Sequence, residues 1–214
     1  THNVSSAASD VYKRQTYTAT FTPSADGLTT IDVLAGEFTD PVGNANTAAS
    51  QFTWTFDGTA PVLTQVTAIS TPTNDTTPSY VFTTGEAGTI TSSLSFTTST
   101  SATVGSNQTI TFSTLSEGTY SGKTLTVTDA YGNAASLTIP DFVIDTTAPV
   151  ISQVTAISTP TADNTPSYVF TTNEAGAISS SNSLTGDVTA EEGNNTITYD
   201  TLEDGTYDSV TVTV

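Results

Sequence analysis

The chain has 214 residues, 35% of them hydrophobic, and carries 21 acidic against 3 basic residues, a formal net charge of −18. So acidic a surface repels nucleic acid and anionic lipid, which excludes both as partners, and no apolar run is long enough to insert into a membrane. The lack of cysteine excludes disulfides, zinc–thiolate sites and thiol nucleophiles, and in an exported β-protein it favours a bacterial origin.

Residues 1–15 differ in composition from everything that follows. They hold the only histidine, His2, and two of the three basic residues, Lys13 and Arg14, whereas Lys123 is the only basic residue later in the chain. The segment resembles translated read-through of a sequencing adapter, and the alternative is a genuine linker. We predict a non-native or disordered leader and leave it out of the fold assignment.

The segment 16–56 is predicted to be the C-terminal half of a divergent repeat, the first repeat. Its Asp40-Pro-Val-Gly-Asn44 sequence has the same spacing as the later Asp129-Ala-Tyr-Gly-Asn133. Both read as the turn of a β-hairpin, since Asp, Asn and Gly favour tight turns.

An internal repeat with a period of 88 residues dominates the remainder. Residues 62–90 and 150–178 match at 23 of 29 positions. The junction sequence Asp-x-Thr-Ala-Pro precedes each copy. We predict a complete middle repeat at 57–144 and a last repeat at 145–214 that is truncated before its final strand. A period this long lets each repeat bury its own core, so we expect an elongated, beads-on-a-string arrangement.

Short runs of alternating apolar and polar residues, interrupted by Gly and Pro, predict an all-β fold. In the middle repeat Tyr80 and Phe82 share one strand face, and Pro140 indicates an edge strand or a bulge. Seven strands are predicted, which fits a two-sheet immunoglobulin-like β-sandwich: 62–69, 79–84, 89–96, a short edge strand within 97–107, 109–112, 124–128 and 135–144.

A tyrosine follows a glycine-containing corner in both later repeats. The sequences are Leu115-Ser-Glu-Gly-Thr-Tyr120 and Leu202-Glu-Asp-Gly-Thr-Tyr207. In immunoglobulin-like sandwiches a tyrosine at the start of the penultimate strand bonds back to nearby backbone through its hydroxyl. We therefore expect both hydroxyls to lock their corners.

Four motifs occur in a fixed order in the middle repeat: the Asp-x-Thr-Ala-Pro junction, a Glu-Ala-Gly turn, the Leu-x-x-Gly-x-Tyr corner and the Asp-x-x-Gly-Asn loop. Together they resemble the bacterial immunoglobulin-like (BIg) tandem repeats of large RTX-type and biofilm surface adhesins, over residues 16–214. The resemblance implies non-catalytic extender repeats of a secreted or cell-surface protein. It also implies that many such repeats bind Ca²⁺ at the junctions between domains.

The excess of carboxylates suggests a hard metal cation, above all Ca²⁺, which takes six to eight oxygen ligands. In a sandwich of this topology the entering linker, a strand-connecting loop and the last hairpin loop share one end of the domain. The candidate ligands are Asp57, Glu86, Asp129 and Asn133 in the middle repeat, Asp145 and Glu174 in the last, and Asp40 and Asn44 in the first. The alternative stays open that these residues only stabilise turns.

The sequence predicts a structural role and not an enzyme. With His2 as the only histidine, no Ser-His-Asp arrangement is available, and the carboxylates recur in turns as structural motifs do. The main prediction is an extracellular spacer whose partners are neighbouring repeats of the same chain, with a host or biofilm ligand bound by other domains. The alternatives are a carbohydrate- or protein-binding module and an accessory domain of a larger extracellular enzyme.

Overall fold

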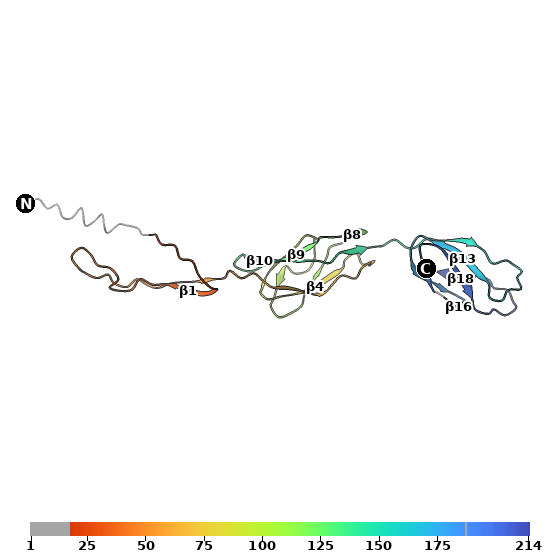
Figure 1. The fold of residues 1–214 in the computed structure, drawn as a ribbon, viewed down its shortest axis with the longest axis horizontal. Helices are drawn as coiled ribbons and strands as arrows, with labels where there is room; N and C mark the ends of the chain where they lie inside the picture. The colour runs from red at the N-terminus through yellow and green to blue at the C-terminus, as the bar shows by residue number, and fades with distance from the viewer. Residues whose placement is uncertain (1–17, 187) are drawn as a thin grey trace, which may run out of the picture. The chain divides into compact units, whose positions relative to one another are not determined.

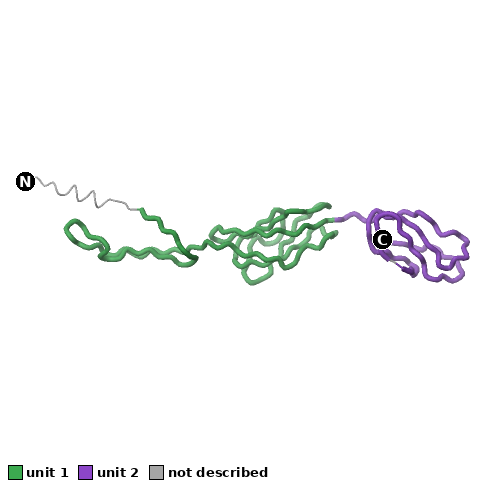
Figure 2. Tube along the Cα trace, viewed as in Figure 1, with its two compact units in different colours: residues 1–144 green, residues 145–214 purple. Residues whose placement is uncertain are grey.

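The computed structural model describes residues 18–186 and 188–214, which form strands and no helix (Figure 1). The fold is therefore all-β, as predicted, and no described residue belongs to a helix that could span a membrane. The chain divides into two compact units, residues 1–144 and 145–214 (Figure 2). The predicted leader at 1–15 lies outside the described residues.

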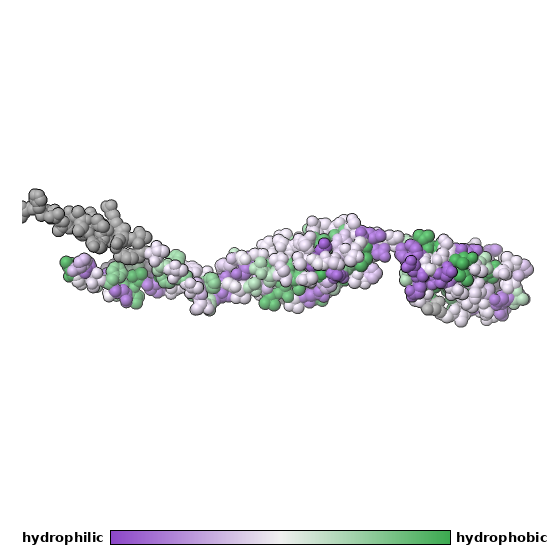
Figure 3. Space-filling view, turned by 45° about the horizontal axis from the view of Figure 1, so that its top comes forward, coloured by the Kyte–Doolittle hydropathy of each residue, from purple (hydrophilic) through white to green (hydrophobic). Residues whose placement is uncertain are grey.

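The described part of the first repeat, 18–56, is an antiparallel hairpin. Strands β1 (Gly27–Ile31) and β2 (Phe52–Phe56) pair from Gly27 opposite Phe56 to Ile31 opposite Phe52. No residue of this hairpin belongs to the buried cores of the described chain. Its exposed apolar residues are Phe21, Leu28, Val33, Leu34, Phe38, Val42 and Phe52. Figure 3 shows hydrophobic surface on this part of the chain.

The middle repeat is built from three antiparallel sheets, with strand orders β3-β4-β7, β10-β9-β5-β6 and β11-β8. Because apolar side chains alternate along β4, Tyr80 and Phe82 are both fully buried, and they contribute to one core with residues of the other sheets. The nine strands are β3 (Leu63–Thr67), β4 (Ser79–Thr84), β5 (Gly88–Ser92), β6 (Ser101–Ala102), β7 (Gln108–Thr111), β8 (Gly118–Tyr120), β9 (Thr124–Thr128), β10 (Ala134–Thr138) and β11 (Phe142–Ile144).

Two of these nine strands were not predicted separately. The predicted strand at 135–144 is wrong as a continuous strand, since it breaks at Pro140 into β10 and β11. Proline cannot donate to a ladder: the Ile139 N–H still bonds to the Lys123 carbonyl at 2.8 Å, and after Pro140 the chain pairs with β8 instead of β9. The second addition is β8 itself, at a segment for which the sequence predicts a corner and no separate strand.

The last repeat reproduces the start of the middle one. Strands β12 and β13 pair as β3 and β4 do, and each pair carries a register shift at the same place, between Gln153 and Thr155 and between Gln65 and Thr67. A separate core forms around Phe170. The strands are β12 (Ile151–Thr155), β13 (Ser167–Thr172), β14 (Gly176–Ala177), β15 (Ser179–Ser180), β16 (Leu184–Thr185), β17 (Thr189–Ala190), β18 (Gly193–Tyr199) and β19 (Val212–Thr213).

The predicted hydroxyl hydrogen bonds of both tyrosine corners are confirmed, but neither tyrosine begins a strand. The hydroxyl of Tyr120 donates to the Ser116 carbonyl at 2.8 Å, and that of Tyr207 to the Glu203 carbonyl at 2.9 Å. Tyr120 ends β8 and stacks on Phe142 of β11, with ring centroids 5.0 Å apart. Residues 205–207 form no strand, and Tyr207 remains 46% exposed. The corner bond is thus local, whereas the ring packing depends on β11.

Replacing Tyr120 by Phe should destabilise the middle repeat by about 1 kcal/mol, because the carbonyl bond is lost while the stack on Phe142 is kept. Tyr120→Ala should cost more, since it removes the stack as well. At the other corner Tyr207→Ala should cost little more than Tyr207→Phe. Chemical denaturation of the four variants measures these differences, and equal costs for the two alanine variants would contradict the packing difference.

Candidate metal centre

Asp57 is the first residue beyond the β1–β2 ladder, so it begins the linker into the middle repeat. Its Oδ1 accepts a hydrogen bond from the Thr59 N–H at 3.2 Å, a local turn in which the side chain folds over the next residues. The side chain is half-buried. Asp57 thus enters the site from the linker, while the other two carboxylates belong to the body of the repeat.

Glu86 lies in the turn between β4 and β5. The buried Thr84 holds this turn: its hydroxyl donates to the Glu86 carbonyl at 2.7 Å and accepts from the Glu86 N–H at 3.3 Å. Gly88 then passes so close to β9 that an added Cβ would lie 2.4 Å from the Thr128 carbonyl oxygen. Glycine at this position therefore brings the Glu86 turn next to the residue after Thr128, which is Asp129.

Asp129 closes the β9–β10 hairpin. Its Oδ1 accepts from the N–H groups of Tyr131 at 2.8 Å and Asn133 at 2.9 Å, and its Oδ2 accepts from the Asn133 side-chain amide at 2.8 Å. The same amide nitrogen donates to the Asp57 carbonyl at 3.1 Å. Asn133 therefore connects the hairpin to the linker through its side-chain nitrogen.

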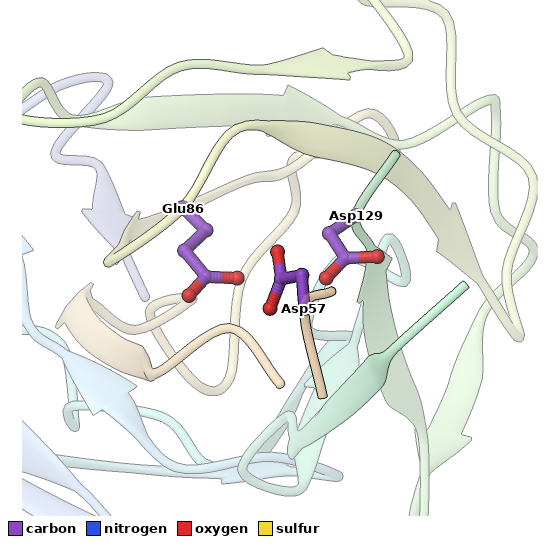
Figure 4. Close-up of side chains that lie close together, drawn as sticks. All are labelled: Asp57, Glu86 and Asp129. Atoms are coloured by element: carbon purple, nitrogen blue, oxygen red, sulfur yellow. The ribbon is translucent and has the colours of Figure 1, made fainter. Parts of the chain in front are cut away.

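The three carboxylates converge although they are far apart in the sequence. One oxygen from each of Asp57, Glu86 and Asp129 lies within 4.8 Å of the other two, and all three side chains are half-buried (Figure 4). Two oxygens that bind one Ca²⁺ from opposite sides are separated by about 5 Å, twice the usual bond length. The spacing therefore suits a single cation between them.

The electrostatics of the cluster are unbalanced. In the described chain none of the three carboxylates forms an ion pair with a basic side chain, and Glu86 Oε2 is buried without a hydrogen-bond partner. Burial, followed by the charges of Asp57, Asp129 and Asp26, raises the pKa of Glu86. Partial burial acts in the same direction on Asp129, but the hydrogen bonds from Asn133 and Tyr131 hold the pKa of Asp129 below its ordinary value.

The hairpin of the first repeat shows what turn stabilisation alone requires. Asp40 accepts from the Val42 N–H at 3.0 Å, the Asn44 N–H at 2.9 Å and the Asn44 side-chain amide at 2.8 Å. These bonds keep its pKa low, the Asn44 amide contributing most. Asp40 has no cluster of carboxylates around it in the described chain. Turn chemistry therefore accounts for Asp40 and for part of Asp129, but it gives the Glu86 carboxylate no partner.

The last repeat contributes two of the predicted ligands. Asp145 accepts from the Thr147 N–H at 3.1 Å, and Glu174 repeats the Glu86 turn, with the Thr172 hydroxyl donating to the Glu174 carbonyl at 3.0 Å. Within the described residues they join no group of three carboxylates. Residues 145–214 contain no counterpart of the hairpin that supplies Asp129.

Sequence reasoning missed Asp26, which stands beside this cluster. Its charge contributes to the raised pKa of Glu86, and its carboxylate accepts hydrogen bonds from Gly58 and Thr59 of the linker. A signal was present, since an acidic residue followed by glycine recurs at Glu117 and Asp204 in the later repeats. Whether such an acidic residue reaches the linker depends on the strand register, which the sequence alone does not give.

Comparisons with family models, with curated proteins and with solved structures give no significant match to this chain.

Replacing Glu86 by Gln should stabilise the metal-free protein at neutral pH. Because the pKa of Glu86 is raised in the folded state, its ionised form opposes folding, and stability falls as pH rises from about 4.5 through the higher folded value. Thermal melts in chelator across this pH range measure the effect. Glu174→Gln in the last repeat is the matched control and should give no such gain; equal behaviour of the two variants would contradict the role of the neighbouring carboxylates.

Proposed function

We propose that this chain is a set of non-catalytic structural spacer repeats from an extracellular, cell-surface protein of bacterial adhesin type, with an immunoglobulin-like sandwich in each complete repeat. The observation that carries the proposal is the convergence of Asp57, Glu86 and Asp129 where the linker enters the middle repeat. A Ca²⁺ ion held there would fasten the linker to the repeat.

The residues present fit this cation. Ca²⁺ binds carboxylate oxygens, and backbone carbonyls with water complete its six to eight ligands. The buried Oε2 of Glu86, which has no partner, gains one when a cation binds. A buried acceptor without a partner costs desolvation free energy, and a bound cation would offset that cost. The cation also offsets the repulsion that raises the pKa of Glu86.

The site can change the mechanics of the junction because its ligands come from different segments. Asp57 belongs to the linker, whereas Glu86 and Asp129 extend from turns that the sheets of the middle repeat hold in place. With the ion bound, the Asp57 carboxylate of the linker is joined through the cation to Glu86 and Asp129 of the repeat. Without it, like charges oppose the same arrangement, and the hydrogen bond from the Asn133 amide to the Asp57 carbonyl has to hold the linker against that repulsion.

Repetition supports the spacer role. The two later repeats have nearly the same sequence over residues 62–90 and 150–178. Each buries a core of its own around equivalent phenylalanines, Phe82 and Phe170. Units that fold independently can be added in series without redesigning a shared core. The acidic surface, with a net charge of −18, keeps such an array soluble.

Calcium should stabilise the middle repeat through the triad. At a free concentration 100-fold above Kd, one site adds about 2.7 kcal/mol to the free energy of unfolding. Asp57→Asn should abolish this gain. Asp163→Asn is the control: it makes the same charge change at an exposed turn of the last repeat, where Asp163 accepts from the Thr165 N–H at 2.9 Å. Titration calorimetry and melting curves with Ca²⁺ measure the gain in stability of the two variants. If Asp57→Asn kept the gain, the proposed site would be wrong.

The mechanical role predicts a shape change in longer arrays. Several complete 88-residue repeats in series should have a larger maximum dimension with Ca²⁺ than in chelator, because bound junctions resist bending. Small-angle X-ray scattering measures this dimension. An array with the Asp57 and Asp129 positions changed to Asn should be unaffected by Ca²⁺, and an unchanged dimension in the unmodified array would count against the stiffening role.

A further inference from the structure

Asp26 holds the linker at the point where the hairpin ladder ends. The last β1–β2 pair is Gly27 opposite Phe56. Beyond it, the Gly58 N–H donates to Asp26 Oδ1 at 2.8 Å, and the Thr59 hydroxyl donates to Asp26 Oδ2. These bonds, the one from Thr59 contributing most, hold the pKa of Asp26 below its ordinary value, so it is an ionised acceptor at neutral pH. A side chain thus continues the ladder by two residues into the linker.

The two residues held in this way directly follow Asp57. On the other side, the Asn133 amide donates to the Asp57 carbonyl at 3.1 Å, so Asp57 is fixed from both the hairpin and the middle repeat. Gly58 suits the close approach: an added Cβ would meet the Phe56 ring at 3.1 Å and Asp26 Oδ1 at 3.5 Å. The orientation of the Asp57 carboxylate therefore depends on where Asp26 holds the backbone.

We infer that Asp26 is a positioning residue for the cation site. By binding Gly58 and Thr59 it directs the Asp57 carboxylate toward Glu86 and Asp129, and so makes the hairpin of the preceding repeat a participant in cation binding by the middle repeat. The inference rests on the proposed Ca²⁺ site. It adds that the site is complete only when the preceding repeat binds the linker through Asp26.

The position of Asp26 is built into the repeat. In the middle repeat Gly118 pairs with Ile144 as Gly27 pairs with Phe56, each pair being the last of its ladder before a linker aspartate. Both glycines adopt a left-handed φ, 129° for Gly27 and 141° for Gly118, which side chains disfavour. An acidic residue precedes the glycine in every repeat, as Asp26, Glu117 and Asp204.

The test uses the full chain with Asp26→Ala and Asp26→Asn. Asparagine can still accept from the Gly58 N–H and can donate to the Thr59 hydroxyl, whereas alanine can do neither. Two quantities are measured: the hydrogen-exchange rate of the Gly58 amide by NMR, and the affinity for Ca²⁺ alone by calorimetry. Asp26→Ala should speed exchange and weaken Ca²⁺ binding about tenfold, the lower end of the effect of outer-sphere partners. Asp26→Asn should keep both near the unmodified values.

Asp32→Ala is the matched control, since Asp32 lies on the same hairpin but accepts from Gln51 at the far end of the ladder. It should change neither quantity. Unchanged exchange and affinity in Asp26→Ala would overturn the inference. Equal loss of affinity in both Asp26 variants, with the Gly58 amide still protected in Asp26→Asn, would overturn it too, because Asp26 would then act through its charge. If the unmodified chain binds no Ca²⁺, the proposed function fails, and Gly58 exchange alone shows whether Asp26 holds the linker.

Discussion

Burial of alternate side chains along β4 is the constraint on which the middle repeat depends. Tyr80 and Phe82 point into the core with no exposed surface, and β4 lies between β3 and β7, which fixes its register on both sides. The next inward residue, Thr84, is buried as well and bonds the turn that carries Glu86. The turn that carries Glu86 is therefore placed by the same alternation that fills the core, and a shift of one residue would turn all three side chains outward.

The acidic cluster is held together by structure that opposes its charge. Gly88 allows β5 to lie against the Thr128 carbonyl, and Asn133 ties the hairpin of Asp129 to the linker. Neither contact relieves the repulsion at Glu86, whose pKa is raised by burial and by its acidic neighbours. A fold that concentrates like charge in this way is stabilised by whatever neutralises it, and this supports the cation proposed for the junction.

The Asp-x-x-Gly-Asn loop occurs in two different surroundings in this chain, at Asp40 and at Asp129. Asp40 and Asp129 make the same three hydrogen bonds to their own turns, so each closes a hairpin without help from a ligand. Only Asp129 is met by Asp57 and Glu86 among the described residues. The difference lies in what the rest of the fold brings to the loop, and not in the loop itself.

The sequence by itself determined the all-β class, the period of 88 residues, the tyrosine corners and the turns that hold the candidate ligands, because alternation, glycine, proline and tyrosine act over a few residues. Only the tertiary structure decided that the strand at 135–144 changes sheets at Pro140, that Asp57, Glu86 and Asp129 meet, and that Asp26 reaches the linker. Those outcomes depend on ladder register and on close approaches such as that of Gly88 to Thr128. Such contacts join residues that are distant in the chain, so no local sequence pattern predicts them.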